Sequence, residues 1–526
     1  MSDQIDTIAA IVRTHSENAP DRSALRSADR SLTYAEFDAL TNRTANALAA
    51  TGVREGDRIV FLDYNSVDHF VVFFAAAKLG AIFVPVNWRL SASEIAAIIA
   101  DSGATTAIIG PPFLDTVVSV RSALPAVKNL LGCGISRPAD SIADLYPLAA
   151  AAPDHDPRAS VCGDDVAVLL YSSGTTGRPK GVMLTHDGMI VHARSTAAMW
   201  RIDEDAQLLA AMPLFHVGGG GWALTGLYRG AGVRVLRDVT AATAWRALVE
   251  ESVTHTFFVP AMIQQLLAAP DRPSRDELSL KVLLYGASPI AVPVLREAIA
   301  LFGPVFIQGY GLTEGGGSLA HLGQEAHDPH EANLLLGSCG RPDPGVELRI
   351  VAPDSWDDRA PYEVGEIVVR SGQNMKGYWN LDSETAAALT SDNWLRTGDA
   401  GYLDDNGYMY LHDRIKDMIV AGGENVYPAE IENVLMAHPD VTDVAVVGAP
   451  HELWGETPLA FVVRSPGSDL SEQEVIDYCR KHLARYKCPT LVSWLDELPR
   501  NGAGKLLKRE LRSRLTPSMQ STVSPH

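Results

Sequence analysis

The chain has 526 residues, of which 46% are hydrophobic and 21% are charged, and its formal net charge at pH 7 is −20. This length exceeds one usual domain, and the acidic balance argues against a nucleic-acid-binding protein, whose footprint is basic. The five cysteines are scattered and form no Cys-x-x-Cys pair. That pattern argues against a disulfide framework or a zinc site and fits a cytoplasmic location.

The most membrane-like stretch covers residues 70–86, FVVFFAAAKLGAIFVPV. Lys78, Gly80 and Pro85 interrupt it well short of the ~20 clean apolar residues that a spanning helix needs. We interpret it as a buried helix followed by a strand. The first 20 residues lack a basic region followed by an apolar core, so no secretory signal is predicted. The sequence therefore predicts no transmembrane segment and leaves peripheral membrane contact open.

Short β-rich runs alternate with Ala/Leu-rich helical runs through the first three quarters of the chain. Residues 57–64, 105–110, 253–260 and 281–289 are such runs, and each precedes a helical pattern. This alternation predicts layered α/β structure with largely parallel sheets. From about residue 345 to residue 370 the β-rich runs follow one another with little helix between them. That change predicts a small antiparallel or barrel-like subdomain.

A domain boundary is predicted within residues 401–432. An Asp-Asn-Gly sequence marks a hairpin turn there, and Pro428 stands in the first turn of a new helix. We therefore expect a large N-terminal domain over residues 1–412 and a small, mobile α+β domain over residues 413–514. Residues 515–526 have no apolar periodicity, which predicts a disordered tail.

The stretch YSSGTTGRPKG, residues 171–181, has the composition of a loop that wraps a phosphate. Its glycines let backbone N–H groups turn toward an anion, and Lys180 adds a full charge. The spacing differs from the ordinary P-loop, which has four residues between its glycines and Ser or Thr after its lysine. A plain surface turn is the alternative. The residues expected at the phosphates are Ser172, Ser173, Gly174, Thr175, Thr176, Gly177 and Lys180.

Three further segments place polar residues in turns. FIQGYGLTEGGG, residues 306–317, sets Tyr310 between glycines and Glu314 after a threonine, so a ring can lie on a base and a carboxylate can hold Mg²⁺. RTGDAGYLD carries Asp399, which we place at a strand end and which suits a diol such as ribose. Lys505 stands in a turn before a basic helix. Taken singly, each segment is also typical of an ordinary structural turn.

Together these segments resemble, in order and spacing, the adenylate-forming superfamily, which contains acyl-CoA synthetases, 4-coumarate–CoA ligases, beetle luciferases and peptide-synthetase adenylation domains. The resemblance covers nearly the whole chain. Its other motifs are PLFHV (213–217), YGASP (285–289), GEIVVRSGQNMKGYWN (365–380), DRIKDMIVAGGENVYPAEIE (413–432) and PRNGAGK (499–505). The resemblance implies that ATP activates a carboxylate as acyl-AMP and that the thiol of coenzyme A then displaces AMP, with Mg²⁺ assisting.

The resemblance also implies a role for each matching residue. Thr176 and Glu314 would place Mg²⁺, and Lys505 would lie between the substrate carboxylate and the α-phosphate. His216 would position the acyl carboxylate, unless it is an ordinary buried histidine. Besides the phosphate loop, the nucleotide would contact Gly286, Ala287, Ser288, Gln308, Gly309, Tyr310, Gly311, Thr313, Asp399, Arg414 and Lys505.

The expected acyl pocket and coenzyme A passage follow from the same motifs. The four consecutive glycines at 218–221 either leave room for a long or bulky tail or serve close helix packing. A hinge at Asp413 would let the C-terminal domain present two faces in turn. The acyl group is expected against His216, Val217, Gly220, Gly221, Tyr285, Gly311 and Leu312, and coenzyme A against Gly422, Gly423 and Glu424. The basic residues Arg480, Lys481, Arg485 and Lys487 either meet its phosphates or form a solvated face.

A neutral hydrophobic acid is the favoured substrate, because no aspartate matches the one that pairs with an amino-acid amine in related enzymes. We favour a medium- or long-chain fatty acid, with an aryl-propenoic (cinnamate-type) acid second. An acyl-AMP ligase that donates to a carrier protein and a non-catalytic acyl- or nucleotide-binding protein are further alternatives. The presence of Lys180, Glu314, Asp399 and Lys505 favours an active enzyme. Dimers are frequent in the superfamily, so a homodimer is compatible with the resemblance.

Overall fold

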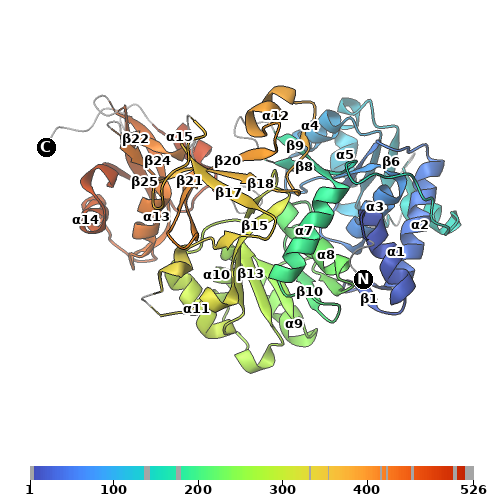
Figure 1. Ribbon diagram of the computed structural model, residues 1–526, viewed down its shortest axis with the longest axis horizontal. Helices are drawn as coiled ribbons and strands as arrows, with labels where there is room; N and C mark the ends of the chain where they lie inside the picture. Colours follow the sequence, from blue (N-terminus) through green and yellow to red (C-terminus); the bar gives the residue numbers. More distant parts are fainter. Residues whose placement is uncertain are drawn as a thin grey trace.

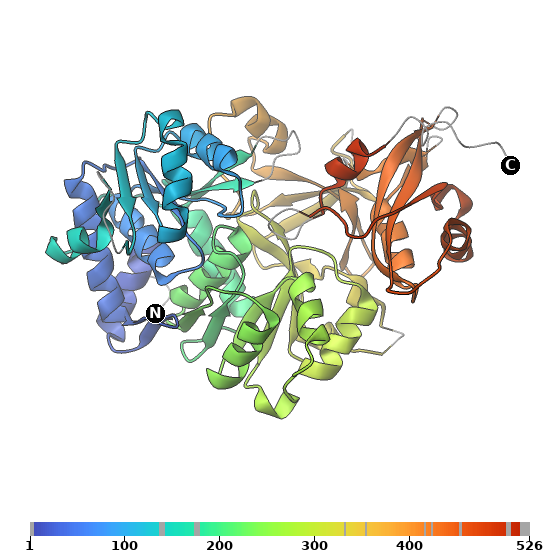
Figure 2. The same cartoon turned by 180° about the vertical axis from the view of Figure 1, so that it is seen from behind.

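The computed structural model describes residues 5–135, 142–172, 179–330, 333–352, 355–414, 417–421, 424–451, 455–500 and 506–515. Only the backbone is described for Asp413, Arg414, Val420, Glu424, Asn425, Gly455 and Tyr486. Within these residues the strands form four sheets. The sheet formed by the last quarter of the chain, orange to red, lies at the opposite end of the molecule from the N-terminal elements in blue (Figures 1 and 2). The predicted mixed α/β class is confirmed.

The first sheet is built mainly from the N-terminal part of the chain and has the order β19-β9-β8-β4-β3-β5-β6-β7. It is parallel from β8 to β7, with β9 and β19 added antiparallel at one edge. The runs predicted at residues 57–64 and 105–110 contain its parallel strands β3 and β5. The bounds are β3 Arg58–Leu62, β4 Ile82–Pro85, β5 Thr106–Ile109, β6 Asn129–Gly132, β7 Ala143–Asp144, β8 Val166–Ser172, β9 Lys180–Thr185 and β19 Gly377–Tyr378.

Helices pack against both faces of this sheet. Successive side chains of a strand point to opposite faces, and in β3 Phe61 joins the core formed with α1 to α3, whereas Val60 joins a second core formed with α4 and α5. A sheet covered on both faces needs apolar residues at consecutive positions, which explains the unbroken IVFL run. The helices are α1 Ile8–Asn18, α2 Tyr34–Ala50, α3 Val67–Leu79, α4 Ala92–Ser102, α5 Leu114–Ser119 and α6 Leu145–Ala151.

The second sheet has the order β16-β15-β14-β13-β12-β10-β11-β1-β2. It is parallel from β14 to β1 and ends in antiparallel strands at both edges. The predicted strand–helix pairs at residues 253–260 and 281–289 are confirmed as β12–α10 and β13–α11. The bounds are β1 Ser23–Arg26, β2 Ser31–Thr33, β10 Gln207–Ala210, β11 Gly232–Val235, β12 His255–Phe258, β13 Val282–Gly286, β14 Phe306–Leu312, β15 Gly317–Leu322 and β16 Arg341–Pro342; α7 His186–Met199, α8 Val217–Tyr228, α9 Ala241–Glu250, α10 Pro260–Ala268 and α11 Val292–Phe302.

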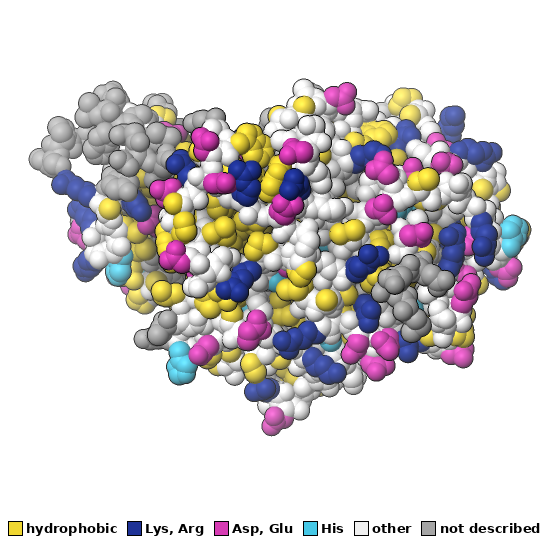
Figure 3. Space-filling model, viewed as in Figure 1, with side chains coloured by type: hydrophobic (Ala, Val, Ile, Leu, Met, Phe, Trp, Pro, Cys, Tyr) yellow, Lys and Arg dark blue, Asp and Glu magenta, His cyan; other side chains and the backbone are white. Residues whose placement is uncertain are grey.

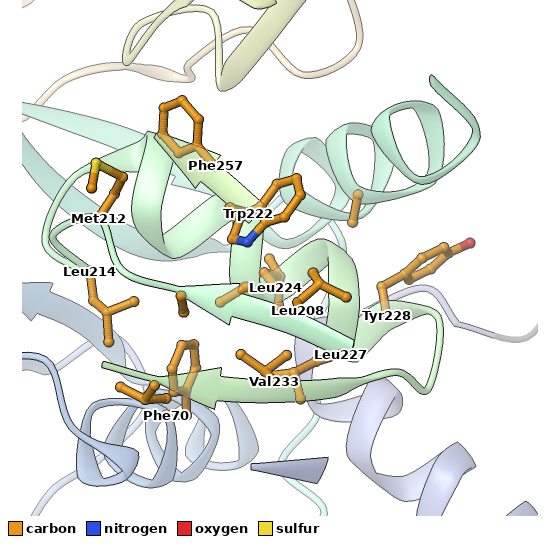
Figure 4. Close-up of a cluster of buried hydrophobic side chains, with 14 of the residues drawn as sticks. Phe70, Leu208, Met212, Leu214, Trp222, Leu224, Leu227, Tyr228, Val233 and Phe257 are labelled. Atoms are coloured by element: carbon orange, nitrogen blue, oxygen red, sulfur yellow. The ribbon is translucent and has the colours of Figure 1, made fainter. Parts of the chain in front are cut away.

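Helix α8 lies at the centre of the core that joins the two sheets. Figure 4 shows Trp222 of this helix and Phe257 of β12 at one side of the cluster, and Phe70 of α3 at the other. Their rings are nearly inaccessible to solvent, and Trp222 Nε1 donates to the carbonyl oxygen of Leu209 at 3.0 Å. The N-terminal layers and the second sheet therefore share one continuous apolar core.

A third, antiparallel sheet has the order β17-β18-β20-β21. This finding confirms the predicted antiparallel subdomain and extends it to residue 414. The Asp-Asn-Gly turn joins β20 to β21, and Gly407 N donates to the Asp404 carbonyl oxygen at 3.0 Å. The bounds are β17 Glu347–Val351, β18 Gly365–Arg370, α12 Asp382–Ala388, β20 Trp394–Leu403 and β21 Met409–Arg414.

The C-terminal part is a small α+β unit with a core of its own. Its sheet has the order β23-β22-β25-β24, with β26 paired to β25, and α13 begins at Pro428 as expected. Apolar side chains of α13 and α14 pack on this sheet. The exact boundary after residue 412 and the hinge at Asp413 stay predictions. The bounds are β22 Ile419–Ala421, β23 Glu424–Val426, α13 Pro428–Met436, β24 Val441–His451, β25 Gly455–Arg464, α14 Glu472–His482, β26 Leu491–Trp494 and α15 Lys508–Ser513.

The apolar stretch at residues 70–86 folds as predicted, because it forms most of the buried helix α3 and then β4. Gly80 ends the helix in the left-handed conformation, with φ of 66°. Throughout the described part of the chain, no helix combines the length and the apolar character that a membrane crossing requires. On the face seen in Figure 3, acidic and basic side chains are interspersed.

We expect the folded protein to lose stability as the pH falls from 7 to 5. Burial lowers the pKa of His69 to about 3 and the pKa values of His186, His192, His255 and His327 to about 4. The unfolded chain takes up these protons below about pH 6.5, whereas the folded chain does not, at a cost of about 1.4 kcal/mol per group and pH unit. Thermal unfolding followed by circular dichroism should give a midpoint that is constant above pH 7 and falls steeply below pH 6.5. A midpoint independent of pH in that range would contradict the burial of these histidines.

Candidate active site

The ends of the two large sheets meet at Glu314. Ser172, the last residue of β8, donates from Oγ to Glu314 Oε1 at 3.1 Å, and Tyr378 donates from its hydroxyl to the same oxygen at 3.2 Å. Lys180 begins β9 and pairs with Ser172 across the hairpin, and its Nζ lies 4.8 Å from the centre of the Tyr378 ring. The hairpin stems that flank residues 173–178, strand β19 and the turn after β14 thus bring a cation, two hydroxyls and a half-buried carboxylate together.

Tyr378 was missed as a site residue by the sequence reasoning. It belongs to the motif MKGYWN, whose aromatic residues are typical of a buried strand, and 64 positions separate it from Glu314. Its strand β19 pairs antiparallel with β9, opposite Val182, and this pairing sets the tyrosine beside Lys180. The available signal was the position of this motif among those that resemble the family, which gives no information on where the hydroxyl points.

A second polar pair connects β14 with the third sheet. The hydroxyl of Tyr310 donates to Asp399 Oδ2 at 2.8 Å, and each residue is 6% exposed. Burial, followed by the charge of Asp399, raises the pKa of Tyr310 well above its usual value, so the hydroxyl remains protonated and can donate. The backbone of Arg414 in β21 lies directly opposite Asp399. The expected neighbourhood of Tyr310, Asp399 and Arg414 is therefore present.

The prediction that Asp399 lies at a strand end is wrong. Asp399 lies within β20, which runs through Trp394–Leu403 and pairs with β18 on one side and β21 on the other. The glycine before it, Gly398, has φ of 71°, and the register with β18 shifts at this point. A β-bulge absorbs the turn-like glycine without ending the strand.

Two of the segments expected to contact the nucleotide, residues 286–288 and 308–311, are adjacent. Strands β13 and β14 are parallel neighbours, with Gly286 opposite Gly309, and a Cβ on Gly286 would lie 2.2 Å from the Gly309 carbonyl oxygen. Only glycine tolerates this approach. Directly after β13, Ala287 has φ of 64°, a conformation that costs free energy for a residue with a Cβ and that gathers at functional turns. Both segments lie at the carboxyl edge of the parallel strands, where ligands of α/β proteins bind.

The turn that carries Thr313 and Glu314 is held from outside by Gln373. Its side-chain Nε2 donates to the carbonyl oxygens of Gly315 at 3.0 Å and Ser318 at 2.6 Å. In addition, Met375 N donates to the Glu314 carbonyl oxygen at 2.8 Å. The motif around residues 373–378 therefore fixes both the backbone and the carboxylate of Glu314.

The contacts of the glycines at 218–221 distinguish the two interpretations that the sequence left open, room for an acyl tail or close helix packing. The glycines at 218–221 lie in the first turns of α8, directly after the N-cap residue His216. A Cβ on Gly219 would lie 2.2 Å from the Pro213 carbonyl oxygen, and one on Gly220 2.9 Å from that of Leu214. At these two positions the helix packs against backbone, which favours the close-packing interpretation.

Other acyl-pocket residues face side chains of the core. Gly218 and Gly221 abut Phe257 and His192, with 3.0 Å and 3.2 Å between the nearest ring atom and an added Cβ. Tyr285 is 2% exposed, and its hydroxyl lies 3.1 Å from His327 Nε2, so its contacts favour a structural role. His216 is half-buried, with its ring centre 4.5 Å from that of Phe215.

Replacement of Gly219 by alanine should destabilise the fold by about 1–3 kcal/mol, because the added methyl group would overlap a carbonyl oxygen that cannot move freely. Gly337→Ala is the matched control, since a Cβ there meets no described atom within 4 Å. Urea unfolding of both variants measures the difference. Equal stability of the two variants would show that the backbone at Pro213 can move enough to accommodate the added methyl group.

Several predicted residues lie outside the described residues: Ser173, Gly174, Thr175, Thr176, Gly177, Gly422, Gly423 and Lys505. Asp413, Arg414 and Glu424 are described by backbone alone. Among the basic residues of the C-terminal part, Lys487 pairs with Glu430 at 2.7 Å and Arg480 with Asp477 at 3.1 Å. These ion pairs favour the solvated-face interpretation for those two side chains.

Comparison with known proteins supports one family along the whole chain. The AMP-binding enzyme family matches residues 12–379, and the AMP-binding enzyme C-terminal domain matches residues 430–505. The fatty acid–[acyl-carrier-protein] ligase ScoC of Streptomyces coeruleorubidus is 37% identical, over 97% of each chain. The feruloyl-CoA synthase of an Amycolatopsis species is 38% identical, over 94% of this chain and 96% of its own.

A solved structure extends the likeness to three dimensions. ATP-bound MatB from Rhodopseudomonas palustris matches with a TM-score of 0.88 and 29% identity, over 98% of this chain and 100% of that one. The likeness in three dimensions therefore extends over nearly the whole length of both chains. The chain therefore belongs to the AMP-binding enzyme family, the adenylate-forming enzymes, and is an AMP-forming acid–thiol ligase.

Proposed function

We propose that this enzyme activates a hydrophobic carboxylic acid with ATP and transfers the acyl group to coenzyme A. In the first step a carboxylate oxygen attacks the α-phosphorus, the bond to the β-phosphate breaks, and acyl-AMP and pyrophosphate form. In the second step the thiol sulfur attacks the acyl carbon and AMP leaves. A medium- or long-chain fatty acid is the preferred substrate class.

The observation that carries this proposal is the group formed by Ser172, Lys180, Glu314 and Tyr378. It stands at both stems of the Ser-Gly-Thr loop, where a polyanion would need donors and a cation. Attack of a carboxylate on ATP brings two anions together, so groups that neutralise charge at the phosphates are the main requirement.

The other predicted site residues are assigned to different parts of ATP, the acid and coenzyme A. Tyr310 and Asp399 form a buried pair suited to adenine and ribose, because a carboxylate can accept hydrogen bonds from a diol. Lys505 offsets the charge that develops between carboxylate and α-phosphate. Gly422, Gly423 and Glu424 then line the path of the thiol, after the C-terminal domain turns about Asp413.

The donor set fits Mg²⁺ bound together with ATP. Glu314 supplies a carboxylate, held by two neutral hydroxyls, and Thr176 would supply a further oxygen. Within the described residues no group of three or more His, Cys, Asp or Glu side chains could hold a metal ion, which suits a cation that takes most of its ligands from phosphates and water. When bound, Mg²⁺ withdraws charge from the phosphate oxygens.

The relatives leave two alternatives that concern the acid and the acceptor. A feruloyl-CoA synthase is 38% identical to the chain, which supports an aryl-propenoic acid as the second candidate. A fatty acid–[acyl-carrier-protein] ligase is 37% identical, which supports a carrier-protein thiol in place of coenzyme A. The family assignment and the presence of Lys180, Glu314 and Asp399 argue against the non-catalytic binding protein that the sequence alone left open.

A coupled assay of pyrophosphate and AMP release tests the proposal. With ATP, Mg²⁺ and a panel of saturated and aryl-propenoic acids, we expect slow pyrophosphate release without coenzyme A and rapid, stoichiometric release of both products with it. Stimulation by phosphopantetheinylated carrier protein and not by coenzyme A would support the alternative acceptor. If none of the acids in the panel supported pyrophosphate release, the proposal would be overturned.

A further inference from the structure

The imidazole of His192, on α7, is enclosed by glycines of two other elements. The residue is 3% exposed, and a Cβ added to Gly221 of α8 would lie 3.2 Å from its Nε2. A Cβ added to Gly317, the first residue of β15, would lie 2.5 Å from its Cε1. Both glycines border segments of the candidate active site, the first turns of α8 after His216 and the turn that follows Glu314. The ring occupies the space that side chains of these segments would otherwise fill.

Three side chains near His192, those of Trp200, His321 and Asp343, are hydrogen-bonded to one another. Trp200 Nε1 donates to His321 Nε2 at 2.7 Å, so His321 carries its proton on Nδ1 and donates it to Asp343 Oδ1 at 2.6 Å. The rings of His192 and Trp200 meet edge to face with 5.9 Å between centres. Among the described residues, His192 Nδ1 and Asp343 Oδ2 are buried and have no hydrogen-bond partner.

The next turn of the same two helices is closed by a satisfied pair. Thr196 Oγ1 and Thr225 Oγ1 lie 3.0 Å apart, and each hydroxyl also donates to its own helix, to the carbonyl oxygens of His192 and Gly221. Because α8 leads inward from His216, these threonines stand one turn deeper than His192. His192 and Gly221 therefore meet one turn nearer to the His216 end of α8 than this closed threonine pair.

A buried polar atom without a partner is costly, and an apolar side chain of similar size would avoid the cost. Burial, opposed by the nearby carboxylate of Asp343, lowers the pKa of His192 to about 4, so the imidazole is neutral and offers both a donor and an acceptor. The side chain facing Gly218 is the phenyl ring of Phe257, whereas the one facing Gly221 is the imidazole of His192. The first turns of α8 therefore face one apolar and one polar ring.

We propose, resting on the function proposed above, that His192 is a specificity-determining residue that hydrogen-bonds a hydroxyl or oxo group at the distal end of an otherwise apolar acid. A site built to bond such a group rejects the analogue that lacks it, because its own buried atom then stays unpaired. The preferred substrate is thus apolar along its length and polar at its far end.

The test compares matched acids in the pyrophosphate-release assay: octanoic with 8-hydroxyoctanoic acid, and cinnamic with 4-hydroxycinnamic acid. The wild-type enzyme should favour the hydroxylated member of at least one pair by about 10-fold or more in kcat/KM. His192→Leu should reduce that preference to about 3-fold or less, mainly by raising KM for the hydroxylated acid. His192→Gln, which keeps a donor and an acceptor, should restore part of the preference.

His255→Leu is the control for the loss of a buried histidine. His255 is 2% exposed at the amino-terminal end of β12, and its two ring nitrogens contact Thr254 Oγ1 at 2.7 Å and the Arg201 carbonyl oxygen at 3.2 Å. This variant should lose stability and keep the acid preference. The inference is overturned if the wild type shows no preference in either pair, or if His192→Leu keeps it. Absence of pyrophosphate release with every acid would instead overturn the proposed function, and the inference with it.

Discussion

Replacement of Lys505 by alanine is expected to lower acyl-AMP formation by about 10³-fold or more while conversion of supplied acyl-AMP to the thioester continues. The ammonium group would offset charge only where the carboxylate meets the α-phosphate, and loss of such a cation in phosphoryl-transfer sites costs about 10³–10⁵-fold. The thiol step needs that space vacated, so the same residue should contribute little to it. Measuring the two half-reactions separately checks the split.

Lys508→Ala is the matched control for the loss of a nearby lysine. Its ammonium pairs with Glu432 at 2.9 Å within the C-terminal part, so both half-reactions should stay close to wild type. Equal losses in the two half-reactions of Lys505→Ala would show that the lysine acts on folding or on domain movement and not on the first chemical step.

Substitution of Glu314 by glutamine should lower adenylation by about 10²–10³-fold, the range found when one group that stabilises the transition state is removed. The amide can still accept hydrogen bonds from Ser172 and Tyr378, so the local packing should survive while the negative charge is lost. Initial rates of pyrophosphate release across a range of Mg²⁺ concentrations give the measurement. The variant should require more Mg²⁺ for half-maximal rate.

Tyr378→Phe separates the charge of Glu314 from its positioning. This change removes one hydrogen bond to Glu314 and keeps the carboxylate and the ring beside Lys180, so the loss should be about 10-fold or less. If Glu314→Gln were no more impaired than Tyr378→Phe, the carboxylate charge would have no part in binding the metal–nucleotide complex.

The layered α/β fold could be predicted because its signals are local. Buried parallel strands appear as unbroken apolar runs such as that of β3, and helix ends carry their own markers, as in the capping box of Thr33 and Glu36 at α2. The position of Asp399 was predicted wrongly because a glycine such as Gly398 is typical of a turn. In the structure β20 pairs with β18 on one side and β21 on the other, and these pairings keep it continuous through a bulge. Such pairing is decided by distant strands.

Contacts within the site were harder to predict, because they join residues far apart in the chain. Tyr310 and Asp399 were both named from motifs, but their hydrogen bond depends on how β14 meets the third sheet. The glycines of α8 show the same limit: the sequence gives their small size, and only the position of residues 212–214 shows that two of them are required for backbone contact.

Exchange of labelled pyrophosphate into ATP, measured in the absence of coenzyme A, tests most directly whether the loop at Ser172 and Lys180 and the carboxylate of Glu314 serve attack on the α-phosphorus. We predict exchange that depends on both Mg²⁺ and a hydrophobic acid and that is lost in Glu314→Gln. Exchange that proceeds without any acid, or that is unchanged in Glu314→Gln, would contradict it.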